Sequence, residues 1–262
     1  MIHIVAALWV SATVLAAAPD DDRLAAASDG VRIWLTRDGG ASWQRIATER
    51  TATDDEQPVR ALLFHDGHLL WATSSGLKAR PLAGGNVEVR SARRLDTLAN
   101  VDGWLYATSE ELLLRSHDGG RSFERVLALP APAESLAHGE VGWVIGTAQG
   151  TYVNAQGIWQ RWAGLTSTGP GRAATVADSQ DGSVWHASVL GLFRARGRDV
   201  TTMTSSAVTA IAVGPSRVWL ATPGQVTTLA ALTESRPPAE GRPMGGTAGA
   251  ADLRGLARRI AR

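Results

Sequence analysis

A short element that recurs six times along the chain is the feature that most constrains the fold. Each copy has a small residue, then Ala, Thr or Ser, then two variable residues and usually Gly, as in the copies that begin at Ala72 and Gly146. Successive copies start 34 to 46 residues apart, and five of the six have a Trp a few residues upstream. Repeats of this length are single supersecondary units that bury their apolar faces only against one another. The sequence therefore predicts an array of similar units.

The third repeat shows how one unit is organised. It contains four short runs rich in Val, Leu, Trp and Thr, which are residues 95–101, 104–108, 112–115 and 122–127. Turns with Gly and Asp separate these runs, as is typical of β strands. One four-stranded antiparallel sheet cannot bury both of its faces, but several sheets around an axis can. We therefore predict an all-β fold, a β-propeller of about six four-stranded blades (range five to seven) over residues 19–233.

Two repeats carry the same motif in the turn between their third and fourth strands. The motif is Ser or Thr, any residue, Asp, any residue, Gly, two further residues and an aromatic residue. Its copies consist of Thr36, Asp38, Gly40 and Trp43, and of Ser116, Asp118, Gly120 and Phe123. An Asp in such a loop accepts backbone N–H bonds, Gly permits a positive φ, and the aromatic ring packs over the loop. These eight residues are expected to hold the turn and not to catalyse a reaction.

On these two motifs the chain resembles the BNR or Asp-box repeat β-propellers, which include sialidases, sortilin-type receptors and photosystem II assembly factors. The resemblance extends through the repeats over residues 23–230. It implies that the Asp motif is structural, that binding occurs on the other face, and that the protein is exported. Sialidase activity uses an arginine in an Arg-Ile-Pro segment, whereas Arg45 and Ile46 are followed here by Ala47. No catalytic residue follows from the resemblance.

The first 18 residues permit two interpretations. Residues 4–18 form an apolar run with the length of a signal-peptide core, Ala16 and Ala18 would supply a cleavage site, and the run is too short to span a bilayer. No Lys or Arg precedes the run, however, and Pro19 would follow the cut. Residues 13–19 also resemble residues 209–215, the first strand of the last repeat, and residues 2–7 would then supply that blade's outer strand. Export to the periplasm or cell surface is the prediction, and a cytoplasmic propeller that contains residues 1–18 is the alternative.

The C-terminal part differs in composition from the repeats. Residues 234–250 are rich in Pro and Gly and predict a linker. Residues 251–262 alternate Leu and Ile with Arg at helical spacing, which predicts a short basic amphipathic helix, or the cut end of a longer one. The tail is therefore expected to be disordered or helical and to lie outside the propeller.

Composition excludes several kinds of site. A net charge of +1 argues against nucleic-acid binding, and the absence of Cys excludes cysteine-based zinc and iron–sulfur centres. His65 and His68 flank an Asp-Gly pair, which is a hairpin signal, so we expect a turn there and not a metal site. No phosphate-binding, zinc-protease or serine-hydrolase motif is present. We therefore predict no metal, no cofactor and no catalytic residue.

Propeller geometry predicts where a partner would bind. The links between blades share one face with the turn between the second and third strands of each blade, away from the Asp motifs, and long loops on a rigid scaffold are the usual functional surface. The charged residues predicted on that face are Arg50, Asp54, Asp55, Arg93, Arg94, Glu110, Glu111 and Arg172. They predict a non-catalytic, monomeric scaffold for a protein or peptide partner. The alternative is a carbohydrate-binding or glycoside-hydrolase-like propeller, which two facing carboxylates beside aromatic residues in the central channel would favour.

Overall fold

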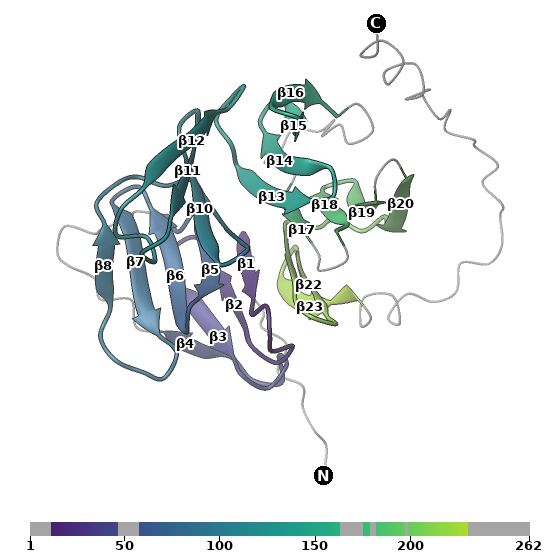
Figure 1. The fold of residues 1–262 in the computed structure, drawn as a ribbon. Coiled ribbons are helices and arrows are strands. Elements are labelled where there is room, and N and C mark those ends of the chain that lie inside the picture. Colours follow the sequence, from purple (N-terminus) through teal and green to yellow (C-terminus); the bar gives the residue numbers. More distant parts are fainter. Residues whose placement is uncertain (1–11, 47–57, 163–174, 179–181, 197–198, 230–262) are drawn as a thin grey trace, which may run out of the picture.

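A computed structural model describes residues 12–46, 58–162, 175–178, 182–196 and 199–229 of the chain. These residues form six antiparallel sheets, the blades, arranged around a common axis (Figure 1). Within each blade the strands pair in chain order, from an innermost strand at the axis to an outer one. The predicted six-bladed β-propeller is therefore confirmed.

The first three blades have four strands each. Blade I consists of β1 (Val14–Ala17), β2 (Ala25–Ser28), β3 (Ile33–Thr36) and β4 (Gln44–Ile46). Blade II consists of β5 (Ala61–His65), β6 (His68–Thr73), β7 (Gly76–Pro81) and β8 (Glu88–Ser91). Blade III consists of β9 (Thr97–Val101), β10 (Trp104–Ser109), β11 (Leu112–Ser116) and β12 (Glu124–Ala128), so its predicted strands are correct to within two residues.

The last three blades complete the ring. Blade IV consists of β13 (Ser135–Gly139), β14 (Gly142–Thr147), β15 (Gly150–Ala155) and β16 (Ile158–Arg161). Blade V consists of β17 (Thr175–Asp178), β18 (Val184–Ser188), β19 (Gly191–Arg196) and β20 (Asp199–Thr204). Blade VI shows three described strands, β21 (Ala210–Val213), β22 (Val218–Thr222) and β23 (Gln225–Thr228).

The ring closes between the first and the last blade. Strand β1 contacts β5 of blade II on one side and β21 of blade VI on the other, and the other innermost strands contact one another in order. Val14–Ala17 is thus a propeller strand. The outer strand predicted from residues 2–7, the linker at 234–250 and the helix at 251–262 lie outside the described residues. Within the described ranges no helix is long and apolar enough to cross a membrane.

The recurring five-residue element forms the turn between the second and third strands of a blade. In blade II the Thr73 hydroxyl accepts a hydrogen bond from the Ser75 amide and donates one to the Gly76 carbonyl. Gly76 has φ +131°, and a Cβ there would lie 2.0 Å from the Ser91 carbonyl oxygen of the outer strand. A Cβ on Gly191 of blade V would lie similarly close to the Thr204 carbonyl oxygen (2.2 Å), so in these two blades only glycine has room at the last position of the element.

The apolar residues lie between neighbouring blades. One cluster joins blades I and II through Ile33, Leu62 and Trp71, and similar clusters lie between the other blades. Trp71, Trp185 and Trp219 are buried, as expected for a tryptophan used once per repeat. Trp104 is 36% exposed instead and lies under the Arg115 guanidinium, 4.9 Å from the ring centre. Most of the repeated tryptophans therefore hold blades together, whereas Trp104 packs at the surface.

Candidate partner-binding face

The two loops with the Asp motif have the same internal hydrogen bonds. In the first Asp loop, residues 36–43, the Thr36 hydroxyl donates to Asp38 (2.8 Å) and accepts from the Gly40 amide (2.9 Å). The Asp38 carboxylate also accepts the Ser42 amide (2.9 Å) and the Ser42 hydroxyl (2.5 Å). The loop is therefore closed around one hydroxyl and one carboxylate.

The second Asp loop, residues 116–123, repeats this arrangement. The Ser116 hydroxyl donates to Asp118 (2.7 Å) and accepts from the Gly120 amide (2.8 Å). Asp118 accepts the amides of Arg121 and Ser122, each at 2.9 Å, and the Ser122 hydroxyl at 2.6 Å. All of these hydrogen bonds lie within the loop, so the Asp118 carboxylate stabilises the turn.

These contacts lower the pKa values of both carboxyl groups. The Ser42 hydroxyl, then the Ser42 amide and the Thr36 hydroxyl, lower the pKa of Asp38 to about 2. The Ser122 hydroxyl is the largest cause of a pKa of Asp118 well below its usual range. A carboxyl group with a lowered pKa is a poor general acid near neutral pH. Both groups remain charged acceptors for the loop.

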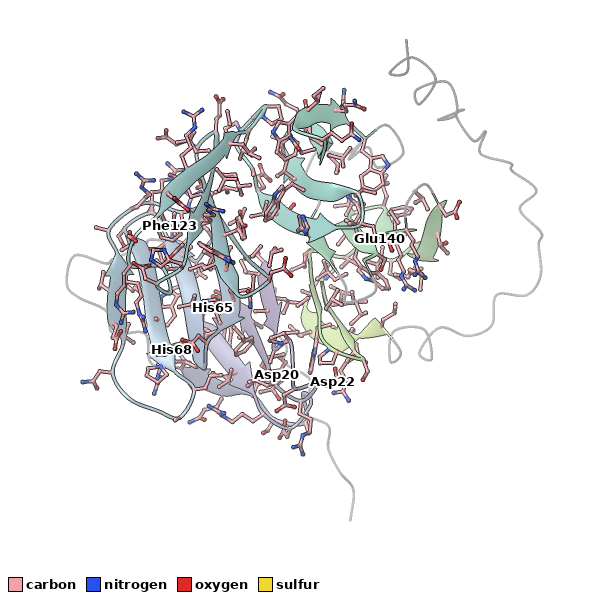
Figure 2. The ribbon with its side chains drawn as sticks, in the orientation of Figure 1. Asp20, Asp22, His65, His68, Phe123 and Glu140 are labelled. Carbon is pink, nitrogen blue, oxygen red and sulfur yellow. The ribbon has the colours of Figure 1, made fainter. Side chains whose placement is uncertain are left out.

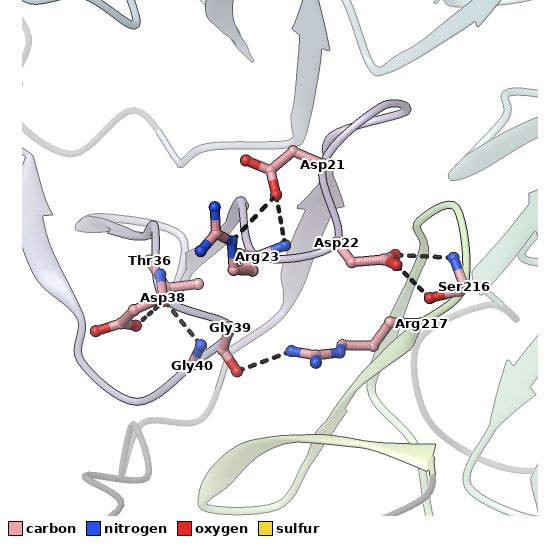
Figure 3. A network of polar contacts seen from close by, with 9 residues as sticks. All are labelled: Asp21, Asp22, Arg23, Thr36, Asp38, Gly39, Gly40, Ser216 and Arg217. Atoms are coloured by element: carbon pink, nitrogen blue, oxygen red, sulfur yellow. Dashed lines mark hydrogen bonds and ion pairs between the residues drawn. The ribbon is translucent and has the colours of Figure 1, made fainter.

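Each Asp loop also packs against the preceding blade. The Trp43 ring of the first loop meets Trp219 of blade VI edge to face, with ring centres 5.9 Å apart. The Arg217 guanidinium of blade VI donates to the Gly39 carbonyl (3.1 Å), and Asp22 accepts the Ser216 amide (2.8 Å) and its hydroxyl (Figure 3). The first loop thus belongs to the seam where the ring closes.

The opposite face carries an ionic cluster around Asp96, which precedes β9. The Arg60 guanidinium donates to Asp96 at 3.1 Å, and Arg94 donates to the same oxygen at 3.2 Å. The other carboxylate oxygen accepts the Glu110 amide at 3.1 Å. Asp96 is only 10% exposed, whereas Arg60 is 33% and Arg94 is 51% exposed. The structure therefore joins the link between blades II and III to a turn of blade III.

The cluster accounts for four predicted residues. Arg94 and Glu110 belong to it, and Arg93 and Glu111 are exposed beside them. Glu110 has φ +55°, an uncommon conformation for a non-glycine residue, and the bond from its amide to Asp96 holds it there. The other four predicted residues, Arg50, Asp54, Asp55 and Arg172, lie outside the described residues.

Sequence reasoning missed the two less exposed members of the cluster, Arg60 and Asp96. Asp96 follows Arg93 and Arg94 closely, and Arg60 stands one residue before β5, as Asp96 stands one residue before β9. Alignment of the repeats on their first strands would have placed Arg60 and Asp96 at the same position of neighbouring blades. That alignment was the signal that could have found them.

Apolar residues lie exposed in other turns of this face. Val189 and Leu190, between β18 and β19, are 51% and 50% exposed, and Val31, between β2 and β3, is 57% exposed. The corresponding turn of blade III holds Glu110 and Glu111. The face therefore has an ionic part on blades II and III and an apolar part on blades V and I.

A cavity of about 340 Å³ lies at the axis between the innermost strands. Arg60, Thr97, Glu134 and Ser135 line it where these strands begin, at the face of the ionic cluster. Among its described lining residues Glu134 is the one carboxylate and Phe64 the one aromatic residue. The two facing carboxylates beside aromatic residues that would favour a carbohydrate-active propeller are therefore not found in the described lining.

The histidine pair lies in a turn. His65 and His68 pair across the end of the β5–β6 hairpin, and Asp66 and Gly67 close it with φ +47° and +67° (Figure 2). Figure 2 places Glu140 well away from them. In the described part of the chain no three His, Cys, Asp or Glu side chains are grouped to hold a metal ion.

Comparison with known proteins shows the fold. No protein-family model matches the sequence, and no curated protein matches it significantly. Among solved structures the chain is similar to YCF48 bound to D1 peptide, with 13% identity, a TM-score of 0.56, and coverage of 87% of this chain and 86% of that one. It is also similar to a gluconolactonase from Xanthomonas campestris, with 13% identity, a TM-score of 0.61 and coverage of 84% and 86%. At such identities the likeness concerns the propeller alone.

Proposed function

We propose that the protein is a non-catalytic β-propeller that binds a protein or peptide partner on the face of the ionic cluster. The observation that carries the proposal is that this face combines Arg93, Arg94 and Glu110 with the exposed Val189 and Leu190. Apolar contacts supply affinity, and charges around them supply orientation and rate of association. An ion-paired cluster on a rigid ring is also preorganised, which lowers the entropic cost of binding.

One of the similar structures supports this proposal. YCF48 has a comparable propeller and was solved with bound D1 peptide. The two Asp loops, with matching contacts at equivalent positions, support placing this chain among the Asp-box repeat propellers. Non-catalytic members of that superfamily provide the precedent for a scaffold that takes part in assembly or sensing.

Whether the protein can be exported with its N-terminal segment cleaved depends on the role of strand β1 in the propeller. Cleavage after Ala18 would remove β1, which lies between β5 and β21 in the ring. Export of an intact propeller would therefore require that the segment stay attached or that cleavage occur before Val14. N-terminal sequencing of the protein from its native cells distinguishes these cases.

Charge reversal tests the binding face. Arg93→Glu together with Arg94→Glu should weaken capture of the native partner from cell extract by about tenfold or more, because two favourable charges become repulsive. Arg121→Glu together with Arg125→Glu is the matched control, since both residues are exposed beside the second Asp loop at the other face. Equal losses in the two double variants, or a loss in the control alone, would show that the proposal places the partner on the wrong face.

A further inference from the structure

A groove of about 240 Å³ lies between blades I and II. Its apolar floor consists of the buried Leu35 and Ile46 of blade I and the buried Leu69 of blade II. One end of the groove lies at the face of the Asp loops, where the Leu82 amide of the β7–β8 turn donates to the Gly67 carbonyl (2.9 Å). Its volume is slightly below the range of roughly 300–1,000 Å³ that is usual for drug-sized ligands, so it suits a smaller molecule.

Strand register shows which polar side chains face the groove. Arg80 pairs with Leu69 across β6 and β7, and directly paired residues of antiparallel strands point to the same face of a sheet. Arg80 therefore faces blade I, as the buried Leu69 does. By the same reasoning Gln44 of β4, which pairs with Leu35, faces blade II. Arg45, the next residue of β4, faces the other side of blade I, because side chains alternate along a strand.

Two arginines border the groove without a carboxylate to balance them. The Arg37 guanidinium, in the first Asp loop, donates through Nη2 to the Leu82 carbonyl (2.5 Å), which holds it across the two blades. Arg80 is half-buried, and in the described part of the chain its guanidinium has no hydrogen bond or ion pair. No Asp or Glu is found among the described lining residues, and the nearby Asp38 carboxylate accepts hydrogen bonds from Ser42 instead.

We propose that this groove binds a small amphiphilic anion, a molecule with a carboxylate or phosphate head and a short apolar chain. The head would accept hydrogen bonds from the Arg37 and Arg80 guanidinium groups, since guanidinium forms strong charge-assisted bonds with such oxyanions. The chain would cover the apolar floor and remove it from water. This site lies on the face opposite Arg93 and Arg94, so it goes beyond the proposed partner binding.

Four probes test on the whole protein whether both the charge and the chain are needed. Binding of hexanoate, hexyl phosphate, hexylamine and acetate is measured by isothermal titration calorimetry at constant ionic strength. We expect hexanoate or hexyl phosphate to bind, and the tighter of the two identifies the head group, with hexylamine and acetate at least tenfold weaker. Binding of neither hexyl anion would overturn the proposal, and so would hexylamine or acetate that binds as tightly as the hexyl anions.

A matched pair of variants locates the site. Arg80→Gln should weaken binding of the tighter hexyl anion about tenfold or more, since it removes a charged donor to the head group. Arg125→Gln removes the same charge from β12 of blade III, where it does not line the groove, and should leave this binding unchanged. Unchanged binding in Arg80→Gln, or equal losses in the two variants, would overturn the assignment.

A second position keeps the test decisive if Arg80→Gln fails to fold. Gln44 is exposed at the groove, so Gln44→Glu changes the charge there without emptying a buried position. The added carboxylate should repel the head group and weaken binding of the hexyl anion by a similar factor. Unchanged binding in Gln44→Glu would contradict the site.

Partner capture distinguishes this inference from the docking proposal. The Arg93→Glu, Arg94→Glu variant should lose the partner and keep binding of the hexyl anion, because neither residue lines the groove. Loss of both activities in that variant would contradict a separate site.

Discussion

The first and second Asp loops have the same internal structure but different neighbours. Each closes around a hydroxyl and a carboxylate with nearly equal distances, such as 2.9 Å from the Gly40 amide to Thr36 and 2.8 Å from the Gly120 amide to Ser116. The first loop, however, contacts residues 178 positions away in the sequence, across the seam between blades I and VI. The second loop contacts blade II, which directly precedes its own. One local motif thus serves both ring closure and the packing of consecutive blades.

The two loops also differ in how they are held. The glycine of the second loop lies close to aliphatic side chains, and a Cβ on Gly120 would stand 2.3 Å from Leu77 and 3.0 Å from Leu105. A Cβ on Gly40 would stand 3.1 Å from the Trp219 ring. The seam adds polar contacts, from Arg217 to Gly39 and from Asp22 to Ser216. The first loop therefore meets blade VI through an aromatic edge and polar bonds, whereas the second loop meets blade II through tight aliphatic contact and the ion pair of Arg121 with Glu88 (3.6 Å).

The largest expected effect comes from opening the seam. Deletion of residues 1–18 removes β1, whose Leu15 and Ala16 are buried in the clusters on either side of blade I. It exposes the unpaired edge of β2 and the side of blade VI, which promotes aggregation. We expect loss of cooperative unfolding, measured by circular dichroism, and association, measured by size-exclusion chromatography.

The control is deletion of residues 1–11, which leaves β1 in place. This shorter deletion separates the contribution of β1 from that of residues 1–11, and it should destabilise the propeller less than deletion of residues 1–18. A soluble monomer with unchanged melting after deletion of residues 1–18 would contradict the role of β1 in closure and would favour a cleaved signal peptide.

A second prediction compares the glycines of the two loops. Alanine at Gly120 or Gly40 would place a side chain at φ near +90°, which costs about 1–2 kcal/mol in either loop. At Gly120 the close approach to Leu77 adds overpacking of about 1–3 kcal/mol. Gly120→Ala should therefore reduce the free energy of unfolding more than Gly40→Ala, as measured by urea denaturation.

Gly103 provides the control for backbone strain. It has φ +79°, and a Cβ at this position would meet no atom within 4 Å, so Gly103→Ala measures the strain without overpacking. Equal losses in Gly120→Ala and Gly103→Ala would show that the second loop can move away from Leu77 at no further cost in stability.

Local and distant features differed in how far sequence could predict them. The strands, the glycine of the repeated element and the Asp loops depend on contacts within one hairpin, so spacing and turn residues were enough. The pairing of Arg60 with Asp96 joins residues 36 positions apart and depends on the angle between blades. The tight approach of Gly120 to Leu77 likewise arises only when two blades pack. The exposed Trp104 shows the same limit, because its repeat position alone predicted burial.

The smallest expected effect is a difference in acid stability. Asp38 has its pKa lowered to about 2 in the folded protein, against an ordinary value of 3.8, so its contribution to stability is present above pH 4 and is lost as the pH falls toward 2. For Asp118, whose pKa is lowered further, the loss extends to lower pH. The difference in urea midpoint between the unaltered protein and Asp38→Ala should therefore shrink as the pH falls below 4, and the difference for Asp118→Ala should begin to shrink in the same range and continue to a lower pH. Burial lowers the pKa of His186 to about 4, so this residue reduces stability progressively as the pH falls from 6.5 to 4 and keeps that effect at lower pH; the effect is the same in each protein and cancels in these differences. A constant difference from pH 5 to pH 2 would show that the loop contacts do not depend on the charge of the Asp, and that packing against the neighbouring blade holds the loops.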